Sequence, residues 1–131
     1  SEHGLKTAMM AIPKLATAIE EGESISVIEQ IISPSIDRAI EIGADTLVFG
    51  CTHYPFVQNI FKKLFSERGY SIRLFDPGLA VAKETIQKFD VAGSGLQKFF
   101  VSKPSSVFNN TVRSLFGESV TVQGVDNTLL D

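Results

Sequence analysis

The residues best suited to chemistry lie in the segment Gly50-Cys51-Thr52-His53-Tyr54-Pro55, which holds the only cysteine of the 131-residue chain. Glycine beside the cysteine permits a sharp turn and leaves room for a ligand. Pro55 is typical of the first turn of a helix, and the free N–H groups and positive dipole at that end would favour a thiolate. The same N–H groups and the Thr52 hydroxyl suit a carboxylate. His53 is a titratable group that could donate a proton, orient the thiol or stabilise the thiolate.

Three other interpretations of Cys51 must be weighed. A single cysteine is commonly a small buried hydrophobic residue. Structural zinc usually takes four ligands, and besides Cys51 and His53 the chain offers only His3, so we expect no metal. A cysteine hydrolase usually brings its cysteine and histidine together from distant parts of the chain. Cys51 lies between Gly50 and Thr52, with a histidine two residues along the chain. This pattern favours a proton-transfer site over the other three interpretations.

Strand-like and helix-like stretches alternate around this turn. We expect strands at 5–10, 46–49, 71–75, 97–102 and 119–125, and helices at 14–21, 24–42, 55–65, 79–89 and 104–116. Ser24 can cap the second helix, and Pro34 should kink or split it. This alternation is typical of an α/β fold with a parallel sheet and flanking helices.

Two of the expected strands end in polar turns. Ligands bind at the carboxyl ends of parallel strands, so the cysteine turn after 46–49 and Asp76-Pro77-Gly78 after 71–75 should share one rim. Asp76 is either a rim carboxylate or the cap of the next helix, and Tyr54 either lines the pocket or closes it. The phenylalanines, Phe56, Phe61, Phe65, Phe99 and Phe100 among them, should lie in the core.

Composition narrows the class of protein. Apolar residues make up 44% of the chain and charged residues 21%, as in globular proteins. A net charge of −3 without a basic cluster argues against a nucleic-acid partner. No apolar run reaches the ~18 to 20 residues that span a bilayer, and no signal peptide is recognisable. A single cysteine needs no oxidising compartment, so we expect a cytoplasmic enzyme or a piece of one.

The segment 43–56, which contains Cys51-Thr52-His53-Tyr54-Pro55, resembles the second catalytic-cysteine motif of glutamate racemase, a family of the cofactor-independent aspartate/glutamate racemase superfamily. The stretches 12–15 and 19–23, the turn and helix at 75–82, and the pieces 99–102 and 107–108 resemble other parts of that family in the same order. The resemblance therefore covers most of the chain and implies a flavodoxin-like lobe.

The resemblance implies roles for individual residues. In the family, one of two opposed cysteines removes the α-proton from one face of the substrate, and the other returns a proton on the opposite face. Each is a thiolate when it abstracts and a thiol when it donates. Cys51 would be the cysteine of the second half, and His53 would assist its proton transfer. Thr52 and Gly50 would bind the substrate, with Asp76 and Tyr54 as possible rim residues. No cofactor is implied, and the substrate would be glutamate, converted to D-glutamate for peptidoglycan.

The chain departs from the family in what it lacks. The Cys-Asn-Thr turn and the early Asp-Ser turn of the first half are absent, and the family's Asp-Ser-Gly reads Asp76-Pro77-Gly78, which removes a hydroxyl. By analogy, residues 1–75 form the second-lobe segment, and 76–131 would return to a first lobe that is missing. We expect the isolated chain to be inactive without that N-terminal half, to expose apolar surface from residue 76 onward, and to be unstable, rearranged or a homodimer.

Two other functions remain open. One is a non-catalytic or decayed module that binds carboxylates through the same turn. The other is a related enzyme of the superfamily, such as an aspartate or hydantoin racemase.

Overall fold

A computed structural model describes residues 4–89 and 94–125 of the chain. His3 and the tail expected at 127–131 lie outside these residues. The chain divides into two compact units, Ser1–Val81 and Ala82–Asp131, and each is described by itself.

Three α-helices and a short 3₁₀ helix build the first unit: α1 (Leu15–Glu20), α2 (Ile25–Glu41), η1 (Tyr54–Val57) and α3 (Gln58–Glu67). Ser24 caps α2 as expected, since its hydroxyl accepts the Val27 N–H at 3.4 Å. Pro34 lies inside α2 and does not split it. One apolar face is buried on both sides of the proline, so both halves of α2 pack against the core: Ile28, Ile32, Ile36 and Ala39.

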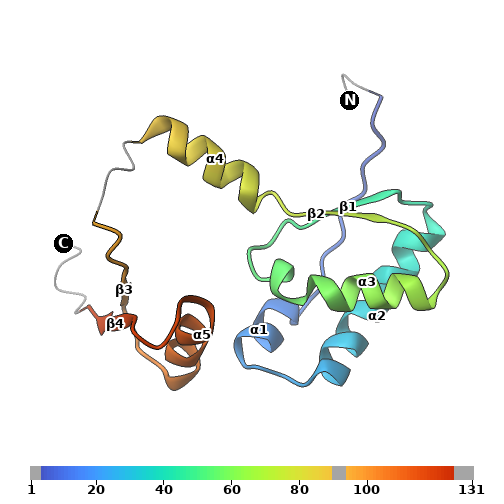
Figure 1. Ribbon diagram of the computed structural model, residues 1–131. Coiled ribbons are helices and arrows are strands. Elements are labelled where there is room, and N and C mark those ends of the chain that lie inside the picture. Colours follow the sequence, from blue (N-terminus) through green and yellow to red (C-terminus); the bar gives the residue numbers. More distant parts are fainter. Residues whose placement is uncertain (1–3, 90–93, 126–131) are drawn as a thin grey trace. The chain divides into compact units, whose positions relative to one another are not determined.

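The cysteine turn follows a short parallel sheet. β1 (Thr46–Val48) pairs with β2 (Arg73–Phe75), with Leu47 opposite Leu74. Both leucines pack partly buried against a core from all three α-helices of this unit and from Phe49, the residue after β1. Helices α2 and α3 lie side by side next to β1 and β2 (Figure 1).

The strand expected at 5–10 is wrong. No strand is assigned there in the described residues, and Met9 is fully exposed. An isolated extended segment without a neighbouring strand has no ladder partners for its N–H and C=O groups.

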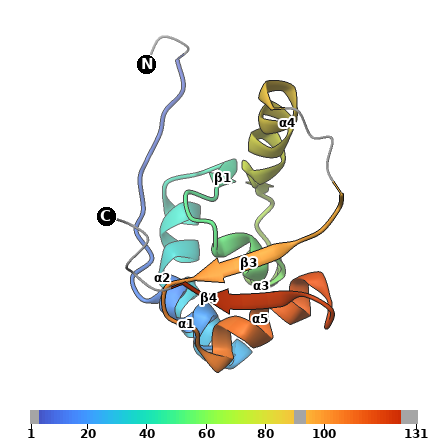
Figure 2. The same ribbon diagram turned by 90° about the vertical axis from the view of Figure 1, so that its left-hand side faces the viewer.

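The second unit contains β3 (Lys98–Val101), α5 (Ser106–Phe116) and β4 (Thr121–Gly124). Strands β3 and β4 are parallel, and Figure 2 shows them side by side with α5 next to them. Phe99 packs against Phe116 of α5 in a tilted arrangement, with ring centroids 4.8 Å apart. Helix α4 (Gly78–Lys88), which joins the two units in sequence, has no buried residue.

Large apolar side chains are exposed from residue 76 onward, as the sequence predicts: Leu79, Val81, Ile86, Leu96 and Phe100 among them. Phe61 and Phe65 are buried as expected, but Phe56 is 55% exposed and Phe100 57%, so their placement in the core was wrong. The predicted α/β fold with parallel strands and flanking helices is confirmed. In the part of the chain that the structure describes, no helix combines the length and apolarity needed to cross a membrane.

Candidate active site

The two polar turns share one rim, as expected. Because β1 and β2 are parallel, their carboxyl ends lie at the same edge, and the Phe49 N–H donates to the Phe75 carbonyl at 3.0 Å just beyond the last pair. Gly50 follows Phe49, and Asp76 follows Phe75. The cysteine turn and Asp76 therefore start from adjacent positions.

The backbone of the cysteine turn closes tightly. The Tyr54 N–H donates to the Cys51 carbonyl at 3.3 Å, and the Phe56 N–H donates to the His53 carbonyl at 3.1 Å. Pro55 lies in the first turn of η1, where its missing N–H leaves no bond unmade. The helix that follows thus begins as a 3₁₀ turn and becomes α-helical only at Gln58.

Gly50 is not needed for the sharp turn that we expected. Its φ lies outside the left-handed region, and a Cβ built there would meet nothing within 4 Å. The other reason we expected for a glycine, room for a ligand beside the backbone, fits this open space at Gly50.

Cys51, His53 and Glu20 form a chain of polar contacts. The Cys51 Sγ lies 3.6 Å from His53 Nδ1. The other ring nitrogen, Nε2, lies 2.7 Å from Glu20 Oε1. Glu20 is the last residue of α1, 31 positions before the cysteine. The side chain of His53 is 30% exposed and that of Glu20 62%, so the site is open to solvent at its outer end.

This arrangement fixes the direction in which a proton can move. A carboxylate can only accept, so Nε2 must carry a proton to bind Glu20. In the neutral imidazole, Nδ1 then carries the lone pair and can accept a hydrogen bond from the thiol at 3.6 Å. Transfer of the thiol proton along this contact would give a thiolate beside an imidazolium that faces Glu20. The three side chains can therefore interconvert the thiol and thiolate forms of Cys51 without removing the proton to solvent.

Thr52 is exposed between Cys51 and His53. Among the hydrogen bonds between described residues, none uses the N–H of Cys51, Thr52 or His53. Successive N–H groups of a turn that are not used internally are suited to an anion such as a carboxylate. A role of Thr52 and Gly50 in binding a carboxylate remains a prediction.

Tyr54 and Asp76 are tied to the surrounding structure. The Tyr54 hydroxyl donates to the Ile12 carbonyl at 3.4 Å. Burial raises the pKa of this phenol, the nearby Cys51 charge raises it further, and the bond to Ile12 lowers it. One carboxylate oxygen of Asp76 accepts the Gly78 N–H at 2.9 Å, so Asp76 caps the start of α4. Its second oxygen forms no hydrogen bond between described residues.

Glu20 was not recognised as a site residue from the sequence. No local pattern connects it to His53, which lies 33 positions further along the chain. The one available signal was its place in the stretch 19–23, which resembles the family in the region before the long helix.

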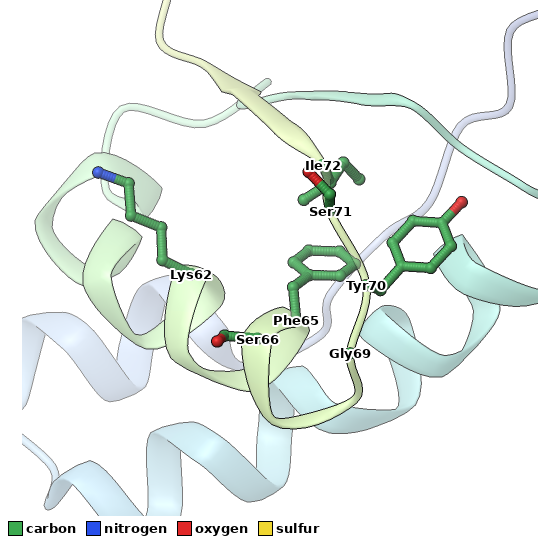
Figure 3. A pocket seen from close by; sticks show the side chains of 7 residues that line it. All are labelled: Lys62, Phe65, Ser66, Gly69, Tyr70, Ser71 and Ile72. Carbon is green, nitrogen blue, oxygen red and sulfur yellow. The ribbon is translucent and has the colours of Figure 1, made fainter.

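One hollow of the first unit lies away from the thiol. It measures about 400 Å³ and is lined by Lys62, Phe65, Ser66, Gly69, Tyr70, Ser71 and Ile72 (Figure 3). Residues 69–72 precede β2 and so lie toward its amino end, opposite to the rim where ligands bind in parallel sheets. Within residues 4–89 and 94–125, no group of three or more histidine, cysteine, aspartate or glutamate side chains could hold a metal ion.

Comparison with known proteins gives a consistent set of relatives. No protein-family model matches the chain. A glutamate racemase of Ralstonia nicotianae is 31% identical over 119 residues, which cover 86% of this chain and 42% of that protein. One of Thermoanaerobacter pseudethanolicus is 29% identical over 126 residues, covering 91% and 47%. One of Sulfurihydrogenibium sp. is 26% identical over 119 residues, covering 89% and 44%.

A solved structure agrees in fold. The glutamate racemase isoform RacE1 of Bacillus anthracis superposes with a TM-score of 0.75 and 23% identity, over 96% of this chain and 49% of the other. The chain thus spans about half the length of the relatives that it matches. The resemblance found in the sequence is confirmed: over most of its length, this chain is similar to glutamate racemases and corresponds to a C-terminal-type portion of them.

Proposed function

We propose that the Cys51 turn supplies one of the two acid/base groups of a racemase that interconverts L- and D-glutamate. The observation that carries this proposal is the contact chain from the thiol through His53 to Glu20 at the carboxyl end of β1. The similarity to glutamate racemases supports the choice of reaction and substrate.

The reaction begins with proton abstraction. The Cys51 thiolate takes the α-proton, so the C–H bond breaks, an S–H bond forms, and the electron pair left on carbon delocalises onto the carboxylate. The Thr52 hydroxyl and the unused N–H groups of the turn stabilise the charge that develops there, with the open space at Gly50 admitting the substrate. A thiol on the opposite face then gives its proton to the same carbon. No cofactor is needed for these two transfers.

His53 and Glu20 prepare Cys51 for either half of this cycle. In the direction that begins at Cys51, His53 holds the thiol proton and Glu20 stabilises the imidazolium. In the reverse direction Cys51 starts as a thiol and donates. Asp76, at the adjacent position of the rim, has one carboxylate oxygen left to meet the substrate ammonium, while Tyr54 closes the turn behind the thiol.

The second thiol must come from outside these residues, because the chain contains one cysteine. We assign it to an N-terminal half of the same enzyme, whose coding sequence should contain a second cysteine turn. The cellular role that fits this activity is cytoplasmic supply of D-glutamate for peptidoglycan.

Conversion of L- to D-glutamate by the full polypeptide that carries this chain tests the proposal. Chiral chromatography should detect the product, and Cys51→Ala should abolish it. His53→Gln should lower the rate by roughly 10² to 10⁴, the usual contribution of a positioned acid/base group. Conversion that survives Cys51→Ala unchanged would refute the proposal.

One alternative is favoured by the single cysteine of these residues. A carboxylate-binding module would bind glutamate without converting it, even in the full polypeptide. Aspartate and hydantoins in the same assay distinguish the related racemases.

A further inference from the structure

Tyr54 connects the cysteine turn to a distant part of the chain. Its hydroxyl lies 3.4 Å from the Ile12 carbonyl oxygen, 42 positions earlier. Two aromatic neighbours hold the ring in place. Its centroid lies 6.5 Å from that of Phe49, in an edge-to-face arrangement, and 6.4 Å from that of Phe61. Both phenylalanines belong to the buried core. The tyrosine therefore projects from a rigid base, and its hydroxyl meets the backbone just before α1.

The Ile12 carbonyl also takes part in the turn that leads into α1. It accepts the Leu15 N–H at 3.3 Å, and Leu15 is the first residue of the helix. Helix α1 has only 6 residues, and its N-terminus has no side-chain capping bond. A helix this short is not stable by itself. Its position depends on tertiary contacts, among them the bond from Tyr54 and the burial of Leu15 and Ala18.

Glu20 lies at the other end of the same short helix. Neighbouring residues of the turn thus hold α1 at both ends: Tyr54 at Ile12 and His53 at Glu20. Because the Glu20 side chain is 62% exposed, its attraction to His53 is weakened by solvent and cannot alone fix the helix. If the contact at Ile12 is lost, α1 can move and the carboxylate can turn to water.

We propose that Tyr54 is a positioning residue whose hydroxyl anchors the start of α1 and thereby keeps the Glu20 carboxylate on His53. The positioning role rests on the proposed function only in taking Cys51 and His53 as a proton-exchanging pair. It acts on Cys51 through two other side chains, without a contact of the hydroxyl to substrate.

Alkylation of Cys51 by iodoacetamide in the full polypeptide that carries this chain, followed by mass spectrometry of the Cys51 peptide, tests the positioning role without any substrate. Glu20→Gln removes the charge that stabilises the imidazolium, so we expect the Cys51 alkylation rate at neutral pH to fall at least about threefold, a coupling typical of interacting neighbours. In a Tyr54→Phe background, which keeps the ring, Glu20→Gln should change the rate by less than about 1.5-fold.

Tyr70→Phe is the matched control. Its hydroxyl also donates to a backbone carbonyl, that of Ala44 at 3.0 Å, and its ring packs on the core residue Phe65. In this background the full effect of Glu20→Gln should remain. An equal effect of Glu20→Gln in the Tyr54→Phe and Tyr70→Phe backgrounds would overturn the positioning role, as would no effect of Glu20→Gln in the unmodified chain.

Amide hydrogen exchange gives a second measurement that does not depend on thiol chemistry. Tyr54→Phe should speed exchange in α1 and at Glu21 at least about threefold relative to α3, because local opening reflects the loss of a tertiary contact. Unchanged exchange in α1 would contradict the role even if the alkylation rates agreed. Both measurements are made without glutamate, so their failure is distinct from a failure to observe racemisation.

Discussion

Replacement of Lys14 by glycine should stabilise the first unit. Lys14 has φ 67° and ψ −8°, and among the described residues it alone has a positive φ without being glycine. It immediately precedes α1, the helix that carries Glu20. A side chain with a Cβ is crowded against the backbone in this conformation.

The expected gain follows from two opposing terms. The left-handed conformation costs an L-residue about 1 to 2 kcal/mol, which glycine avoids. Glycine in turn makes the unfolded chain more flexible, at a cost of about 0.4 to 1 kcal/mol. The Lys14 side chain is exposed, and no hydrogen bond or ion pair between described residues involves it, so little else is lost. The net gain should be about 0.5 to 1 kcal/mol in the free energy of unfolding.

Urea unfolding followed by tyrosine fluorescence measures this gain. Both tyrosines of the chain, Tyr54 and Tyr70, belong to the unit Ser1–Val81, so the signal reports that unit. Lys14→Ala is the control, since it removes the long side chain and keeps the Cβ. Lys14→Gly should be the more stable of the two variants. Equal stability of the two, or lower stability of Lys14→Gly, would refute the backbone-strain reasoning.

Three further predictions test other parts of the structure. Arg68→Lys should lower the stability of the first unit by about 0.5 to 1 kcal/mol in the same urea assay, because lysine lacks the guanidinium fork that binds α2; unchanged stability would contradict this. The Tyr54 phenol should ionise above the usual pKa of 10.0, because burial and the nearby thiol charge disfavour phenolate. Phenolate absorbance followed against pH in a Tyr70→Phe variant measures this pKa. An ordinary pKa would contradict the burial of the phenol. Gly124→Ala should lower the melting temperature followed by circular dichroism, because a Cβ would lie 2.9 Å from Pro104 Cγ; Gln123→Ala should be milder, and equal effects would disprove the clash.

Much of the fold could be predicted from local signals. The alternation of apolar runs and helical repeats located the four strands that the structure contains and its helices to within a few residues. The parallel pairing of β1 and β2, and with it the shared rim of the cysteine turn and Asp76, followed from a general rule about connections between strands.

The errors concern features that depend on neighbours distant in sequence. Residues 5–10 have strand-like composition, but a strand needs a partner to pair with. Phe56 and Phe100 are as apolar as the buried Phe61, yet what covers a side chain is decided by tertiary packing. Pro34 was tolerated because the buried face of α2 continues past it.

The site was predictable only where its residues are contiguous. Cys51, Thr52 and His53 could be recognised together because they form one turn. Glu20 joins them through the packing of α1 against η1, and the Tyr54 contact to Ile12 is equally remote in sequence.

Incorporation of solvent deuterium at the α-carbon, measured from each enantiomer of glutamate separately, tests the proton-transfer role of Cys51 most directly. In the full polypeptide with Cys51→Ala, neither enantiomer should be converted to the other. The enantiomer whose α-hydrogen faces Cys51 should also take up no deuterium, because the thiolate that would remove this hydrogen is absent. Exchange of both enantiomers at the unmodified rates would contradict the assignment of Cys51 as an acid/base group.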